Sequence, residues 1–268
     1  KGNISIASGT TLGFSPASAN TLTFNGTSAQ VISRLGTLTL GANEAVVIAN
    51  TGSPTASVTF NQAQTVSGSM TVNSGSILAT NATLTLAGTP AINGSFQINQ
   101  GGWATGGTWN YGAGGTLIFN NSSGSYGVNA DVWWPTTNGP VNVTVAGAGG
   151  ITMNVARTVS GMFQTAAGVT NANNLTLNGT GKLNGGGFFA AVPVWGAAST
   201  LVYNTGGTFG RANEFPNSGN LPANVQVSNS TTINYPNAGL AARTISGNLT
   251  IDAGSSFYMD YGSPNPGV

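Results

Sequence analysis

The chain has 268 residues, of which 40% are hydrophobic and only 4% are charged, and its formal net charge is +1 at pH 7. The apolar residues are numerous enough to bury a core, which argues against intrinsic disorder. The few, scattered basic residues argue against binding nucleic acid by neutralising its phosphates. Cys is absent, which excludes disulfides and thiolate metal sites, and no apolar run reaches the roughly 18 residues of a membrane-spanning helix.

Short segments in which Thr or Ser alternates with large apolar residues recur along the whole chain. In chain order they lie at 3–6, 21–24, 37–40, 57–60, 69–72, 83–86, 142–145, 174–177, 199–204, 224–227 and 248–251. A period of two residues predicts half-buried β-strands, and the Gly, Asn and Ser residues between them predict turns. We therefore expect Thr23, Thr39 and Thr250 to be exposed. We expect a buried face made of Leu22, Phe24, Leu38, Leu40, Leu84, Leu86, Leu175, Leu177, Leu249 and Ile251.

Several of these strings are repeated in the same order. Residues 64–68, 157–161 and 243–247 share one pattern, and 115–120 resembles 199–204. They define three degenerate repeat units, at approximately 10–75, 76–168 and 169–254, within one continuous domain over 1–268. Because the repeat pattern is already under way at Asn3, we expect the chain to be a segment of a longer protein.

The repeats predict an all-β fold, and a parallel β-helix, or β-solenoid, is the favoured architecture. Repeat units differ in length by about 20 residues, which is close to one coil of a solenoid. The many Asn, Thr and Ser residues also suit ladders of identical side chains along a coil axis. A tandem array of antiparallel β-sandwiches is the alternative.

The strings at 24–33, 199–216 and 241–255 resemble repeats in very large secreted surface proteins of Bacteroidota. The resemblance implies adhesin-like β-solenoid stalks or fibres that the type IX secretion system exports, and therefore an extracellular or outer-surface location. The motifs that carry it are structural and mark no active site.

Acidic residues are few, namely Glu44, Asp131, Glu214, Asp252 and Asp260, and His is absent. Asp131 and Glu214 occupy related places in the repeats, before Trp134-Pro135 and Phe215-Pro216. They are interpreted either as an acid pair or as loop residues that accept hydrogen bonds from backbone N–H groups. Since glycosidases need two carboxyl groups about 5–10 Å apart, we expect no catalytic residues, no resident cofactor and no enzyme activity. Calcium held incidentally by carbonyl and amide oxygens stays open.

Aromatic residues gather in the middle of the chain, and they have two interpretations. They form a carbohydrate-contacting surface, or they fill the interior of wider coils. The residues concerned are Trp103, Trp109, Tyr111, Trp133, Trp134 and Trp195.

A further alternative is an ice-binding face, because Thr-x-Thr pairs on one strand face can order water. The pairs Thr21/Thr23, Thr37/Thr39 and Thr83/Thr85 have this spacing. The sequence as a whole favours a structural or adhesive module. Its expected partners are neighbouring repeats of the same chain or other copies, with secretion machinery and surface polysaccharide as further candidates. Nucleic acid and membrane insertion are not expected.

Overall fold

The computed structural model describes residues 2–52, 57–234 and 243–258. They fall into two compact units, residues 1–122 with 130–142 and residues 123–129 with 143–268. Within the described residues almost every element is a β-strand, and the one short 3-10 helix, η1, spans Ala172–Asn174. No helix in this part of the chain is long and apolar enough to cross a membrane.

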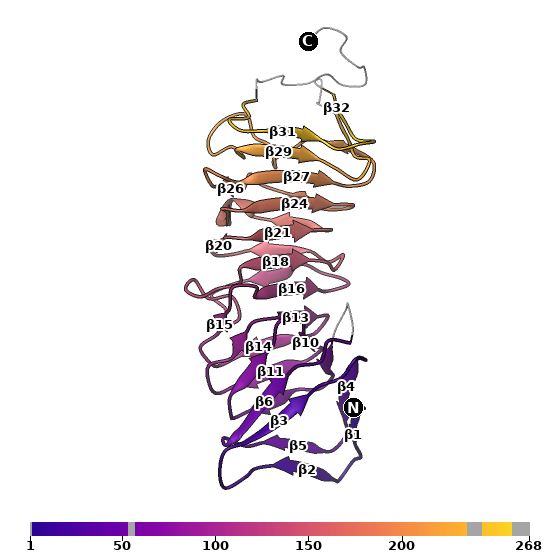
Figure 1. Cartoon of the computed structure of the whole chain (residues 1–268), viewed down its shortest axis with the longest axis vertical. Coiled ribbons are helices and arrows are strands. Elements are labelled where there is room, and N and C mark those ends of the chain that lie inside the picture. Colours follow the sequence, from indigo (N-terminus) through magenta and orange to yellow (C-terminus); the bar gives the residue numbers. More distant parts are fainter. Residues whose placement is uncertain (1, 53–56, 235–242, 259–268) are drawn as a thin grey trace. The chain divides into compact units, whose positions relative to one another are not determined.

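Unit 1 is built from coils that each contribute a strand to three parallel sheets (Figure 1). The long sheet of unit 1 has the order β1 (Ile4–Ile6), β4 (Gln30–Arg34), β7 (Val58–Phe60), β10 (Ile77–Thr80), β13 (Ser95–Asn99) and β16 (Thr116–Asn120). The second, here named the threonine sheet, contains β2 (Thr11–Phe14), β5 (Thr37–Leu40), β8 (Gln64–Val66), β11 (Thr83–Leu86) and β14 (Trp103–Thr105). The third sheet of unit 1 contains β3 (Asn20–Phe24), β6 (Glu44–Ile48), β9 (Met70–Val72), β12 (Ala91–Ile92) and β15 (Asn110–Tyr111).

Unit 2 is also built from parallel sheets, but its last coils contribute strands to two sheets rather than three. Its long sheet runs β18 (Asn142–Val145), β21 (Met162–Thr165), β24 (Thr180–Asn184), β27 (Thr200–Asn204), β29 (Asn224–Val227) and β31 (Leu249–Ile251). A second sheet contains β17 (Tyr126–Val128), β19 (Ile151–Met153), β22 (Gly168–Thr170) and β25 (Phe188–Phe189). Two smaller sheets contain β20 (Arg157–Val159), β23 (Leu175–Leu177) and β26 (Val194–Trp195), and β28 (Thr208–Gly210), β30 (Thr232–Asn234) and β32 (Ser256–Tyr258).

The strand pairs of both units are parallel, as in β2 with β5 and β24 with β27. The predicted β-solenoid is therefore confirmed, and the alternative of antiparallel sandwiches is wrong. A coil contains 18 to 28 residues, measured as the sequence separation between hydrogen-bonded partners on adjacent coils. The shortest separation joins Asn81 to Asn99, and the longest joins Asn3 to Val31. Each coil satisfies its backbone N–H and C=O groups on the coil beside it, so a short strand is stable only within the stack.

Alternation along the strands places apolar side chains inside each unit. Of the residues predicted to face inward, Phe24, Leu38, Leu40, Leu84, Leu86, Leu175 and Leu177 are buried, and Leu22 is half-buried. Thr23, Thr39 and Thr250 are exposed, as predicted. The pattern of the sequence thus identified the core face of most strands.

The prediction is wrong for Leu249 and Ile251, whose side chains are 44% and 46% exposed. In register they follow Val225 and Val227, which are buried, so both lie on the inward face of β31. However, β31 is the last strand of its sheet in the described residues. Burial in a solenoid needs a coil on each side, and the alternating pattern does not show whether a strand has both neighbours.

Asparagine side chains form ladders along the long sheets. In unit 1, Asn120 Nδ2 donates to Asn99 Oδ1 at 2.9 Å, and Asn99 and Asn81 each donate to the Asn of the preceding coil at 2.7 Å, ending at Asn61. In unit 2, Asn204 donates to Asn184 at 2.8 Å. The ladders arise because equivalent residues of successive coils lie about 4.8 Å apart, within reach of an amide.

The sequence repeats do not coincide with the structural units. The boundary between the two compact units falls inside the predicted repeat 76–168. The similar strings at 69–75 and 161–168 also form strands of different sheets, β9 in the third sheet of unit 1 and β21 in the long sheet of unit 2. In contrast, 115–120 and 199–204 form β16 and β27, which both belong to long sheets. The strings therefore encode strands rather than fixed positions in a coil.

Candidate functional site

The outer surface of the threonine sheet presents hydroxyl groups in register. Thr85 is aligned with Thr65 on one neighbouring strand and with Thr105 on the other. Leu40 pairs with Val66, which places Thr39 beside Thr65 in the same column. A second column contains Thr11 and Thr37, and further along the sheet Thr83 and Trp103. Apart from Gln64, the inward neighbours on these strands are apolar and buried or half-buried, so the alternation turns the threonines outward.

Two of the three predicted Thr-x-Thr pairs share this surface. Thr37/Thr39 and Thr83/Thr85 both lie on the threonine sheet, whereas Thr21/Thr23 lies on β3 in the third sheet. There the register places Ala45 and Val47 beside Thr21 and Thr23. The sequence spacing identified the pairs, but only the register shows which of them make one array.

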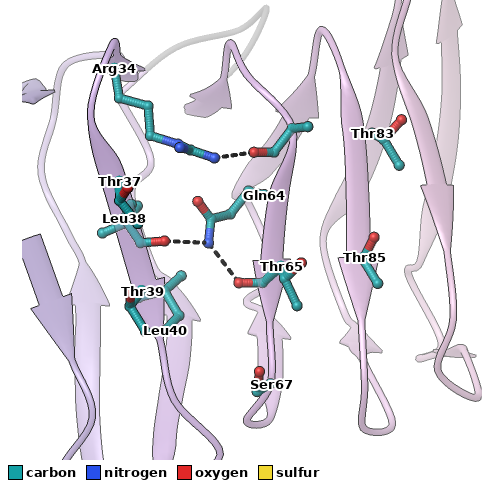
Figure 2. Close-up of a pocket in the computed structure, with 11 residues that line it drawn as sticks. Arg34, Thr37, Leu38, Thr39, Leu40, Gln64, Thr65, Ser67, Thr83 and Thr85 are labelled. Carbon is teal, nitrogen blue, oxygen red and sulfur yellow. Dashed lines mark hydrogen bonds between the residues drawn. The ribbon is translucent and has the colours of Figure 1, made fainter. Parts of the chain in front are cut away.

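A groove of about 330 Å³ opens on this surface between β5 and β8 (Figure 2). Threonines from both sides line it, and so do Arg34 and Gln64. In the register, β5 and β8 are bridged at Leu40 and Val66, while β2 and β5 are bridged along four residues. The groove therefore lies where the backbone ladder between two coils is interrupted.

Side chains replace the missing backbone partners in this gap. Gln64 Nε2 donates to the Leu38 carbonyl at 3.3 Å and to the Thr65 carbonyl at 2.6 Å. The Arg34 guanidinium donates to the Gly36 carbonyl at 2.9 Å and also to the Ala63 carbonyl. Figure 2 shows the Gln64 side chain in the gap between its own strand, which also carries Thr65, and the strand that carries Leu38. Arg34 lies at one end of the groove. These donations give hydrogen bonds to carbonyl groups that border the gap.

The other side of the Gln64 amide is unsatisfied. Its side chain is only 4% exposed, and Oε1 accepts no hydrogen bond from any described residue. A buried acceptor without a donor costs about 1–3 kcal/mol. Sequence reasoning missed Gln64, because a Gln between Ala63 and Thr65 in a Thr-rich string resembles any other polar strand residue. What distinguishes Gln64 is that it is a polar residue on the inward face of its strand, where it is aligned with Leu84.

The predicted aromatic residues lie mainly in the interior. All of them except Trp103 are buried, so they do not form an exposed platform for a sugar. Trp109 packs on Phe96 with ring centroids 4.8 Å apart, and its Nε1 donates to the Gly106 carbonyl. Burial of these side chains argues against an exposed carbohydrate surface built from them and fits the interpretation that they fill the coil interior.

Several polar atoms of the buried aromatics have hydrogen-bond partners within their own units. Tyr111 Oη donates to the Trp133 carbonyl at 2.7 Å, and burial raises the Tyr111 pKa well above its ordinary value. Trp134 is buried in the same unit, and in unit 2 Trp195 Nε1 donates to the Glu214 carbonyl. Trp103 is half-buried, with its ring edge-on to Trp133 at 5.6 Å. Of the predicted set, only Trp103 combines partial exposure with a place on the threonine sheet.

The carboxyl groups are dispersed. Asp131 belongs to unit 1 and Glu214 to unit 2, and Asp260 lies outside the described residues. Glu214 is fully buried, where its Oε1 accepts hydrogen bonds from the Ala212 N–H at 2.7 Å and the Tyr203 hydroxyl at 2.9 Å. Glu214 therefore fits the interpretation of a loop residue that binds backbone donors. Within the described ranges, no group of three acidic side chains is placed to hold a metal ion.

Comparison with known protein families, with characterised proteins and with solved structures finds no match to this chain.

Proposed function

We propose that the chain is a structural or adhesive segment of an extracellular protein, such as a stalk, a fibre or a cell-surface adhesin. The observation that supports it is the coil-by-coil ladder within each unit. Each coil is hydrogen-bonded to the next through parallel strands and, in places, through asparagine ladders. Because every coil uses the same contacts, length is added simply by adding coils, which suits a spacer.

The proposed location and origin rest on sequence. The resemblance of 24–33, 199–216 and 241–255 to repeats of large Bacteroidota surface proteins favours export by the type IX secretion system. A surface with few charges and many Thr, Ser and Asn residues accords with such an origin. The proposed partners are neighbouring repeats, other copies of the chain, and polymers at the cell surface.

Mechanical unfolding tests this role most directly. In a one-dimensional stack, a pulling force applied at the two ends should release coils in succession rather than the whole chain at once. Coils of 18 to 28 residues should each lengthen the chain by roughly 60–100 Å at ~3.5 Å per residue. Single-molecule force spectroscopy should show steps in this range. Loss of all structure in one event would contradict the proposal.

The proposal also includes the absence of catalysis. Incubation with a panel of polysaccharides should release no product, because the carboxyl groups of the described residues are dispersed. Turnover that disappears in Asp131→Asn or Glu214→Gln would show that the chain is an enzyme.

A further inference from the structure

The groove on the threonine sheet has the features of a ligand site rather than of a packing defect. Its volume of about 330 Å³ far exceeds the roughly 10–15 Å³ needed to hold a single water. It contains a buried amide whose nitrogen is fully used and whose oxygen is not. The site therefore lacks a hydrogen-bond donor at one defined atom, Gln64 Oε1.

The chemistry of the lining specifies the kind of donor. Threonine hydroxyls donate and accept equally well, so a ligand rich in hydroxyl groups satisfies them in either direction. A carboxylate or sulfate brings only acceptors, and it would face the unsatisfied oxygen of Gln64 without a proton to give. The Arg34 guanidinium is already engaged with the carbonyls of Gly36 and Ala63. The groove thus matches neutral hydroxyl groups better than anionic ones.

The array around the groove repeats along the coils, which favours a polymer over a single small molecule. Neighbouring strands lie ~4.8 Å apart and successive outward residues on a strand ~6.6 Å apart. Thr39, Thr65, Thr85 and Thr105 follow one another in register, with Trp103 beside the last of them. A chain lying across these strands meets a hydroxyl group on each coil.

We infer that the outer surface of the threonine sheet binds a neutral polysaccharide, whose hydroxyls meet the threonine columns and, when the Gln64 side chain shifts toward the groove that it lines, donate to Gln64 Oε1. This inference rests on the proposed adhesive role and names the polymer that the module holds. It differs from the aromatic platform predicted from sequence, because hydroxyl and amide groups carry the recognition and Trp103 contributes only at the margin.

The test uses the whole chain and matched polymers. A neutral xylan, a linear β-glucan and a mannan are compared with alginate and heparin by isothermal titration calorimetry. The double variant Thr65→Val/Thr85→Val removes one exposed and one half-buried hydroxyl with little change of shape. Gln64→Met removes the unsatisfied acceptor together with the two donations of Nε2 to the Leu38 and Thr65 carbonyls, so thermal melts must first show that this variant folds. Thr21→Val/Thr23→Val makes the same change on the exposed face of β3 and serves as the control.

We expect at least one neutral polymer to bind. Both test variants should weaken it by about tenfold, which is about 1.4 kcal/mol of binding free energy, because each removes groups that hydrogen-bond the polymer. The control should bind like the wild type. The inference is overturned by binding to the anionic polymers alone, by no binding at all, or by equal losses in test and control variants. It is also overturned if the chain shapes growing ice crystals and binds no neutral polymer, which would assign the columns to ordered water.

Failure of this inference and failure of the proposed function give different results. If polysaccharide binding is absent while the pulling experiment shows coil-by-coil extension, the spacer role stands and the groove assignment falls. If extension occurs in one event, the structural role falls whatever the groove binds.

Discussion

Glu214 is a carboxyl group placed entirely inside unit 2, although most Glu residues in proteins are solvated. Removal from water raises its pKa, and the N–H of Ala212, the Tyr203 hydroxyl and the charge of Arg211 offset only part of that rise. Its second oxygen, Oε2, has no hydrogen-bond partner among the described residues. The protonated acid is therefore the form that this site favours.

This environment predicts a dependence of stability on pH. The folded-state pKa lies above the ordinary value of 4.5, so the folded chain holds this proton more tightly than the unfolded chain. The resulting stabilisation is complete below pH 4.5 and is lost as the pH rises through the folded-state pKa. Thermal melts of the wild type at a series of pH values should show the decline.

The variant Glu214→Gln should remove that decline, because an amide resembles the protonated acid and still accepts from Tyr203. Glu214→Ala should be less stable at every pH, since Tyr203 Oη and the Ala212 N–H then lose their acceptor. If the melting temperatures of the wild type and of Glu214→Gln changed in parallel from pH 4 to 8, this carboxyl would not be the source of the pH dependence.

At the scale of a strand, the alternation of β23 gives a sharp contrast between neighbours. Leu177 is 1% exposed, whereas Thr176 faces outward and is half-buried. Leu177→Asp should lower the free energy of unfolding by several kcal/mol, about 3–5, because it buries an unpaired charge and removes apolar contacts. Thr176→Asp should change it by less than about 1 kcal/mol. Denaturant titration measures both, and similar losses in the two variants would contradict the assigned faces.

The asparagine ladder of unit 1 offers a second test at this scale. Asn99 donates to Asn81 and accepts from both Asn120 and Gln97. Asn99→Ala removes all these bonds near the surface, so we expect a loss of about 1–2 kcal/mol. Asn173→Ala, at an exposed Asn, is the control and should be nearly neutral. The ladder would be shown to contribute nothing if denaturant midpoints of the two variants agreed.

Alternation made the strands and their faces predictable, because period two is a local property that Leu84, Leu86 and their neighbours display directly. Features that depend on the neighbouring coil were not predictable. The exposure of Leu249 depends on whether β31 is covered, and the groove depends on how β5 and β8 pair. Burial of Trp109 and Trp133 depends on which side chains the fold packs against them, here the rings of Phe96 and Phe119. The sequence located the Thr-x-Thr pairs, but Gln64 gained its significance only from the register.

At the scale of the whole molecule, the edge of a coil stack decides how chains associate. On one side β31 pairs with β29, and among the described residues no strand pairs with its other edge. The exposed inward-facing side chains of Leu249 and Ile251 lie on the same strand. An unpaired parallel edge that also exposes apolar residues is a template for another strand.

We therefore predict that the purified chain self-associates as its concentration rises, and that Leu249→Ser/Ile251→Ser reduces this association. The substitutions remove apolar area that a second strand or coil would bury, at about 25 cal/mol per Å². Light scattering over a concentration series measures the mass, and hydrogen exchange reports whether the amides of β31 are protected. Thr244→Ser/Thr250→Ser, which alters exposed polar residues in the same region, is the control. A wild-type chain that stays monomeric at high concentration with β31 protected would mean that this edge is already covered, and the prediction would be wrong.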